Sequence, residues 1–323
     1  MAKKKESVEM ALEVEETTEL VLDDLVDDEL SLELDDDVDT MGLETLDEVP
    51  EPSLEPSRPK MSAPLSEIEG LITDIDDSIH YLTWVIYGKN GTGKTTLLST
   101  ADGVLILAAE DGTLSIRDKA KGKAKKLKID TWEKLEAVYW LLKDGKWLKD
   151  KEGNVTGIEI STKTGKFIVR YLAIDTVTKL AEVCMRNVVL GSKAKDIDRD
   201  VIKRTMRDWG DMSEKMKYWI QQFEELPIQR VWTFQESSNS EDVDSEEFSI
   251  FPAVNKSLRT YVLSEADIIA RTYIAKTEKG VQYRISAAPN ANYVTKDRTS
   301  TLNKGAIANP SLEKLYQLVF ETK

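Results

Sequence analysis

Apolar residues recur from about residue 81 onward in two alternating patterns. Short runs that are apolar throughout predict buried strands, and longer stretches with apolar residues every three or four positions predict helices. The expected strands cover residues 81–87, 103–109, 158–160, 167–174, 230–234, 267–275 and 281–287. The expected helices cover residues 67–75, 132–143, 178–189, 209–226 and 310–320. Strands alternating with helices indicate an α/β fold, with a mostly parallel sheet covered on both faces.

The first 60 residues have a different pattern, dominated by acidic side chains. They hold 21 Asp and Glu against 5 Lys and Arg, whereas the rest of the chain holds 38 (59 − 21) against 39 (44 − 5). A segment so poor in aromatic residues does not bury enough apolar surface to offset the entropy lost on ordering. We therefore expect residues 1–64 to be a disordered acidic tail and residues 65–323 to form one domain. Leucines among the acids leave open whether the tail only aids solubility or folds on a partner.

The composition excludes several kinds of site. The chain has one cysteine, Cys184, and one histidine, His80, which rules out a disulfide framework and zinc sites built from several such residues. No run approaches the roughly 18 apolar residues of a membrane span. The Lys-rich start leads into acidic residues and not into the apolar stretch of a signal peptide. We expect a cytoplasmic protein without a membrane partner.

The strongest chemical signal is a glycine-rich loop between a strand and a helix. Residues 88–95 fit the phosphate-binding pattern G-x-x-x-x-G-K-[ST]. Backbone N–H groups in such a loop curl around phosphate oxygens, Lys94 contacts the terminal phosphates, and the Thr95 hydroxyl holds Mg²⁺. An Asn-Lys-x-Asp guanine motif is absent, so we predict ATP and Mg²⁺ as ligands. The expected nucleotide-binding residues are Gly88, Lys89, Asn90, Gly91, Thr92, Gly93, Lys94, Thr95 and Thr96.

Polar residues follow three of the other expected strands. Asp175 ends the strand 167–174 and is predicted to hold a water of the Mg²⁺ ion beside the loop. Glu110 and Gln235 stand directly after the strands 103–109 and 230–234. Ligands of open α/β sheets bind at the carboxyl ends of strands, so Glu110 is a candidate to orient the attacking water, with Asp111 as the fallback. Gln235 is a candidate to contact the γ-phosphate. A plain loop or helix-cap role stays open for both.

These residues resemble the RecA-like ATPase core of the P-loop NTPase superfamily. More narrowly, residues 80–323 resemble the RecA-like nucleotide-binding proteins of bacteriophages, a group that includes single-strand annealing recombinases. The features that carry this closer resemblance are Ile174-Asp175-Thr176, Trp209, Lys296-Asp297-Arg298 and Asn309-Pro310.

The resemblance implies more than the residues do. Such proteins bind ATP at subunit interfaces, form rings or filaments, and hold single-stranded DNA, which would place this chain in the cytoplasm of a host bacterium. It implies that Glu110 and Lys94 are catalytic and that Gln235 is a catalytic switch at the start of a DNA-binding loop. Lys296 and Arg298 would reach the phosphates from the same or the neighbouring subunit, unless they form a surface turn paired with Asp297. A single-strand-binding or replication protein is a further expected partner.

Charge complicates the DNA prediction. The segment after Gln235 is acidic, although phosphate contacts favour the opposite sign. Residues 117–128 carry seven basic residues and one acid, and residues 193–207 carry six and three, but a solvated charged face is equally compatible with both. We expect an ATP-hydrolysing protein that handles single-stranded DNA in recombination or replication. The alternatives are a DNA-independent assembly ATPase and a nucleotide-switched scaffold that acts on a protein partner.

Overall fold

The computed structural model describes residues 81–112, 116, 120, 122–194, 198, 200–238, 250–278 and 280–320. The chain divides after Ile68 into two units, and every described residue belongs to the second. The expected tail and the expected helix 67–75 lie outside the described residues. So do most of the acidic segment after Gln235 and parts of both basic stretches.

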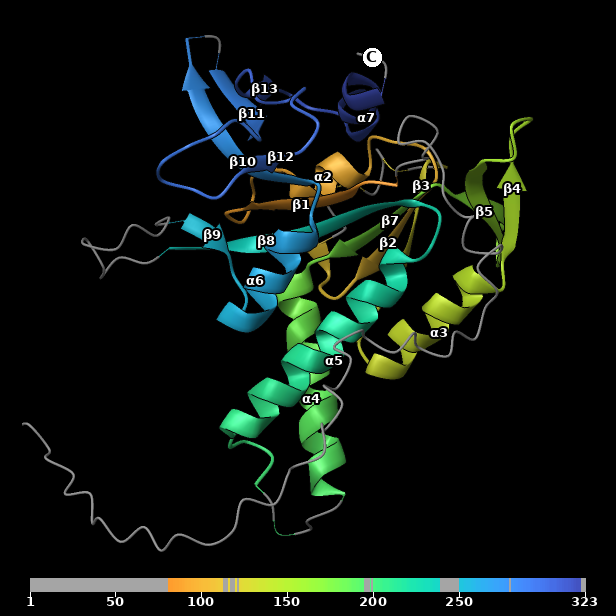
Figure 1. Ribbon diagram of the computed structural model, residues 1–323, viewed down its shortest axis with the longest axis vertical. Helices are drawn as coiled ribbons and strands as arrows, with labels where there is room; N and C mark the ends of the chain where they lie inside the picture. Colours follow the sequence, from red (N-terminus) through yellow and green to blue (C-terminus); the bar gives the residue numbers. More distant parts are fainter. Residues whose placement is uncertain are drawn as a thin grey trace, which may run out of the picture. The chain divides into compact units, whose positions relative to one another are not determined.

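One sheet forms the centre of this unit and contains ten of the described strands. Its main path runs β13-β11-β10-β1-β8-β7-β2-β3, in which the six strands from β10 to β3 are parallel (Figure 1). These six are β1 (Thr83–Gly88), β2 (Val104–Ala108), β3 (Ala124–Lys128), β7 (Tyr171–Asp175), β8 (Gln229–Ser238) and β10 (Ile268–Thr277). The antiparallel additions are β9 (Ile250–Pro252), β11 (Gly280–Ser286), β12 (Lys296–Asp297) and β13 (Ile307–Ala308). The expected RecA-like α/β fold with a mostly parallel sheet is confirmed.

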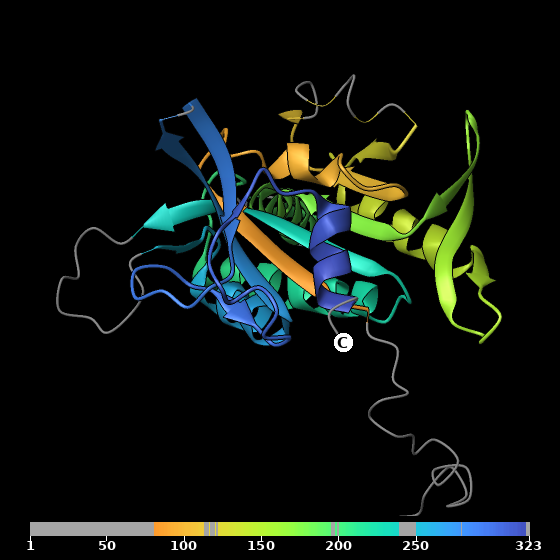
Figure 2. The ribbon, with the colours of Figure 1, turned by 90° about the horizontal axis from the view of Figure 1, so that it is seen from above.

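Helices cover both faces of the sheet (Figures 1 and 2). One face packs against α2 (Lys94–Leu98) and α7 (Leu312–Phe320). The other packs against α3 (Trp132–Lys143), α4 (Val177–Lys193), α5 (Met206–Glu224) and α6 (Lys256–Glu265). Strand residues alternate between the two cores: Trp84 and Ile86 of β1 enter the first, and Val85 and Tyr87 enter the second.

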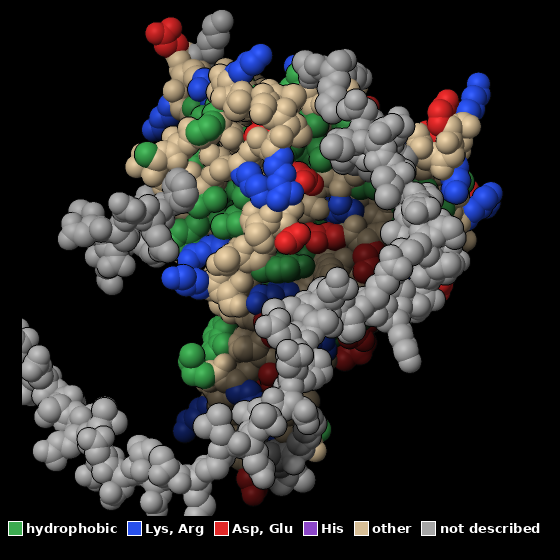
Figure 3. Space-filling model, in the orientation of Figure 1, with side chains coloured by type: hydrophobic (Ala, Val, Ile, Leu, Met, Phe, Trp, Pro, Cys, Tyr) green, Lys and Arg blue, Asp and Glu red, His purple; other side chains and the backbone are tan. Residues whose placement is uncertain are grey.

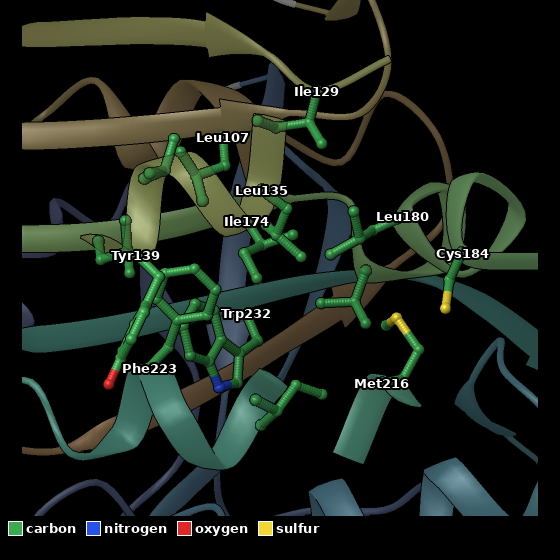
Figure 4. Packing of buried hydrophobic residues seen from close by; sticks show 14 of the residues in the cluster. Leu107, Ile129, Leu135, Tyr139, Ile174, Leu180, Cys184, Met216, Phe223 and Trp232 are labelled. Carbon is green, nitrogen blue, oxygen red and sulfur yellow. The ribbon is translucent and has the colours of Figure 1, made fainter. Parts of the chain in front are cut away.

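The larger core holds the sheet rigidly against its helices. Figure 4 shows Leu107, Ile174 and Trp232 of three adjacent strands packed against residues from α3, α4 and α5. All three are at most 1% exposed. Burial of this kind contributes about 25 cal/mol for each Å² of apolar surface removed from water. The carboxyl ends of the strands are therefore fixed positions on which a site can be built.

The expected strand 167–174 is wrong as a single element. The chain forms β6 (Gly165–Val169), then exposes Arg170, then forms β7 in the main sheet. β6 belongs to a separate antiparallel sheet with β4 (Lys146–Lys149) and β5 (Val155–Thr162). β6 and β7 both contribute buried residues. The hydrophobic pattern therefore does not indicate where the chain leaves one sheet and enters the other.

Other differences are additions at the sheet edges. The late hairpin is confirmed as β10 and β11, and Gly280 at its turn has a φ of 109°, which favours glycine. The basic stretch 117–128 ends in an edge strand, β3, whose last three residues are exposed, so it lacks the apolar pattern of a buried strand. In the described part of the chain, no helix is both long and apolar enough to cross a bilayer.

Candidate active site

The glycine-rich loop begins where β1 ends, at the centre of the sheet. Gly88 pairs in register with Gln235 of β8. A Cβ atom at Gly88 would lie 2.4 Å from both the carbonyl oxygen and Oγ1 of Thr272 on β10, so only glycine fits there. Gly93 precedes α2 with a φ of 90°, again a conformation that favours glycine. The sequence motif thus corresponds to a loop whose backbone requires both residues.

Lys94 lies inside this loop and is only 7% exposed. Its Nζ donates hydrogen bonds to the carbonyl oxygens of Gly88 at 2.8 Å and Lys89 at 3.0 Å. Burial lowers the pKa of Lys94, while the nearby carboxylates of Asp175 and Glu110 act in the opposite direction. The ammonium group is therefore held where phosphate oxygens would approach the loop. Lys89 itself, with Asn90 and Gly91, is exposed.

Thr95 and Asp175, the two residues predicted to hold the metal, are in direct contact. Thr95 Oγ1 donates to Asp175 Oδ2 at 2.7 Å, and Thr233 Oγ1 of β8 donates to Asp175 Oδ1 at 2.8 Å. Asp175 is 1% exposed, so the two hydroxyls fix its carboxylate in one orientation. Mg²⁺ prefers oxygen donors and is commonly held by one or two protein groups plus phosphates and waters. The hydroxyl and the carboxylate fit that ion.

Glu110 and Gln235 meet across β7. Gln235 Nε2 donates to Glu110 Oε2 at 3.4 Å, and the backbone N–H of Gln235 donates to Thr178 Oγ1 at 3.1 Å. Burial and the charge of Asp175 raise the pKa of Glu110 above its usual value. Asp111 is exposed and forms an ion pair with Lys128 at 3.2 Å. The geometry therefore favours Glu110 over Asp111 as the group that faces the phosphates.

Lys296 and Arg298 are not brought to the loop of their own chain. Asp297 of β12 pairs with Ile268, and Ile268 pairs with Trp84. Trp84 lies near the start of β1, whereas Gly88 and the loop lie at the other end of that strand. A contribution to the phosphates of a neighbouring subunit stays a prediction.

The contacts of the basic pair are with the end of α6. Lys296 Nζ donates to the carbonyl oxygens of Leu263 and Ser264, and Arg298 donates to Ser264 and to Asp267 Oδ1 at 3.2 Å. Cations at a helix C-terminus are favourable because the last carbonyl groups lack partners within the helix. The alternative of a surface turn paired with Asp297 also differs from the structure, because Lys296 and Asp297 form β12 and the acid that pairs with Arg298 is Asp267.

A cavity of about 280 Å³ lies beside the loop and was not foreseen. It is lined by Thr92, Gly93, Thr96, Leu97, Thr272, Tyr283, Arg284, Asn309 and Pro310. The ring of Tyr283, on β11, approaches the position of a Gly93 Cβ to 3.2 Å. The cavity thus has an aromatic wall next to the phosphate-binding backbone.

Three residues of this site were missed by the sequence reasoning. Thr233 lies two positions before Gln235, so strand alternation alone would have placed it on the same face. Thr272 shares a hydrogen bond of 2.8 Å with Thr92, and Tyr283 covers Gly93. The position of Thr272 depends on the pairing of β10 with β1, which no local pattern indicates. Tyr283 lies in the expected hairpin, but no local pattern indicates that this hairpin joins the sheet beside the loop.

The fold and the loop define this protein as a P-loop NTPase with a RecA-like core. More particularly, the chain belongs to the AAA domain family, whose AAA_24 model matches residues 80–299. Among solved structures, it is similar to a KaiC-like protein from the hyperthermophilic archaeon Pyrococcus horikoshii OT3. The identity is 11%, the match covers 71% of this chain and 90% of the other, and the TM-score is 0.36. No curated protein matches the sequence.

Proposed function

We propose that this chain binds ATP together with Mg²⁺ and hydrolyses the ATP to release its terminal phosphate. The observation that carries the proposal is the 2.7 Å contact between Thr95 and Asp175 directly beside the buried Lys94. A hydroxyl, a carboxylate and an ammonium group at the carboxyl edge of a parallel sheet match the needs of phosphoryl transfer, which depends on positioning and charge stabilisation.

Each further residue has a role in this proposal. The cavity beside Gly93 takes the nucleoside, with Tyr283 against the base. Glu110 orients the attacking water, and its raised pKa suits a group that accepts a proton. Gln235, in contact with Glu110, faces the terminal phosphate and responds to its loss.

We further propose that turnover is coupled to single-stranded DNA in phage recombination or replication, in a ring or filament of subunits. Support comes from Gln235, which connects the site to the strand end that leads into residues 239–249. On the part of the face that is coloured in Figure 3, Lys and Arg side chains lie at several separate places, with Asp and Glu side chains among them. An assembly ATPase that acts on a protein partner therefore remains the second candidate.

The decisive experiment is ATP turnover by Lys94→Ala with and without single-stranded DNA. We expect loss of nucleotide binding or turnover in the variant. Lys166→Ala is the matched control, since the exposed Lys166 side chain pairs with Glu159 in the small sheet, outside the site and both basic stretches. Wild-type turnover by Lys94→Ala would refute the ATP site. Turnover of the wild-type protein that does not respond to DNA would favour the assembly ATPase.

A further inference from the structure

We infer that the ion pair between Arg271 and Glu236 is a positioning device that aims Gln235 at Glu110 during ATP turnover. This inference rests on the proposed ATPase function and assigns to the reaction two residues that lie outside the phosphate loop. It starts from a salt bridge that is unusually well buried for this protein.

The pair is held by two contacts. Arg271 Nε donates to Glu236 Oε2 at 2.8 Å, and Nη2 donates to Oε1 at 3.2 Å. The side chains are 17% and 4% exposed, and the guanidinium centre lies 4.9 Å from the ring centre of Tyr293. In each of the other described salt bridges, at least one of the two side chains is more than 24% exposed. The Arg271–Glu236 pair is therefore the best buried of them. Two parallel bonds from a planar guanidinium fix the direction of the carboxylate as well as its distance.

The pair spans the strand that carries the phosphate loop. Arg271 belongs to β10 and is in register with Tyr87, whereas Glu236 belongs to β8, one residue beyond the partner of Gly88. Because β1 lies between β8 and β10, the salt bridge ties its two neighbours together at the point where the loop begins.

Gln235 and Glu236 are adjacent on β8, so their side chains leave the strand on opposite faces. Gln235 contacts Glu110 on one face, and Glu236 is locked by Arg271 on the other. Without the lock, the end of β8 keeps its backbone contacts with Thr178 and β9 but loses the side-chain anchor on one face. A small twist of the strand would then move the Gln235 amide away from Glu110. A displacement of about 1 Å in a positioned group is enough to cost up to about 100-fold in rate.

The same lock reaches the segment that follows. Glu236 pairs with Pro252 of the antiparallel strand β9, and Ile250 at the start of β9 forms a bridge with Tyr293. Tyr293 is also the ring against Arg271. β8, which ends at Ser238, and β9, which begins at Ile250, thus both connect to the salt bridge that sets Gln235.

The test compares Arg271→Lys, Glu236→Gln and Gln235→Ala, singly and combined. Arg271→Lys keeps the charge but loses the two-point geometry, so it is the variant best able to fold. We expect kcat to fall about tenfold or more in each single variant, with KM for ATP within about threefold of wild type. In the Glu236→Gln background, adding Gln235→Ala should lower kcat by less than about twofold, because the two residues act as one unit.

Glu159→Gln is the control, since Glu159 pairs with Lys166 in the small sheet. Thermal melts report the folded fraction of each variant. The inference is overturned if the reductions in kcat caused by Glu236→Gln and Gln235→Ala simply multiply in the double variant. It is also overturned if Arg271→Lys lowers the melting temperature while kcat per folded molecule is unchanged. These outcomes differ from failure of the proposed function, in which the wild-type protein shows no turnover that depends on Lys94.

Discussion

Glu110 is a half-buried carboxylate of the site whose surroundings raise its pKa. It lies just after β2 and contacts Gln235. Burial and the charge of Asp175 both raise its pKa. These influences favour its protonated form. A base with a raised pKa holds a proton more strongly once it accepts one, which suits the orientation and activation of water.

Glu110→Gln should keep ATP binding and slow hydrolysis by roughly 100-fold or more, because the amide cannot accept the proton. The wild-type pH profile should show activity lost as pH falls through the pKa of Glu110, above the value of about 4.3 for an unperturbed glutamate. The acid limb should be absent from the residual activity of the variant. Steady-state turnover from pH 4.5 to 8 and a nucleotide-binding titration check both points. Lost binding with an unaltered rate would assign Glu110 a different role.

Individual residues differ in how far the sequence alone could place them. The loop 88–95 is a local motif, so its spacing predicts its structure. Asp175, Glu110 and Gln235 follow apolar strands, and the carboxyl ends of parallel strands meet at one edge. Lys296 and Arg298 were harder, because a motif in a connecting segment does not say which end of β10 it pairs with.

At the scale of elements, α5 shows how a helix start can be set by side chains that the hydrophobic pattern does not include. The helix begins at Met206, three residues before the expected start. Thr205 and Asp208 form a capping box: Thr205 Oγ1 accepts from the Asp208 N–H at 3.3 Å, and Asp208 Oδ2 accepts from the Thr205 N–H at 2.7 Å. Met206 is exposed and does not extend the apolar periodicity of the helix. Only the capping box therefore indicates where α5 begins.

Thr205→Ala should lower the unfolding free energy by about 1 kcal/mol, the usual cost of losing an N-cap side chain. For a domain of this size, that corresponds to a melting temperature lower by about 2–4 °C. Thr131→Ala is a matched control, because Thr131 is the N-cap residue of α3 but accepts no capping hydrogen bond. Equal shifts in the two variants, measured by calorimetry, would argue against the capping box as the source of stability.

Elements at the margins of the sheet were the least predictable. The central strands are buried on both faces and read as continuous apolar runs. β3 and β4 are mostly exposed, and only Arg170 separates the apolar residues of β6 from those of β7. A strand that is defined by its partner and not by its own burial leaves little trace in its sequence.

For the whole molecule, the main feature is the separation of charge between residues 1–60, with a net −16, and the rest of the chain, with a net +1. A tethered polyanion has a high effective concentration and competes with nucleic acid for cations. Deleting residues 1–60 should therefore tighten binding of single-stranded DNA about tenfold at low salt and less at moderate salt, as screening increases. Basal ATP turnover should not change.

Fluorescence anisotropy with a labelled oligonucleotide at several salt concentrations measures this effect. A scrambled tail of equal charge is the control, since it should restore the weaker binding if charge alone is responsible. Weaker DNA binding after deletion would contradict competition and indicate that the tail recruits a partner or assembles subunits.

The edge strand β3 has a consequence for how copies of this protein can meet. Within the described residues, no strand pairs with its outer side. Three of its five residues are lysines, at positions 125, 126 and 128. Charged side chains, lysine above all, are a common protection against edge-to-edge aggregation, because a joining strand would have to bury or crowd them. Neutralising these lysines would remove this protection and favour uncontrolled pairing of β3 with strands of other molecules.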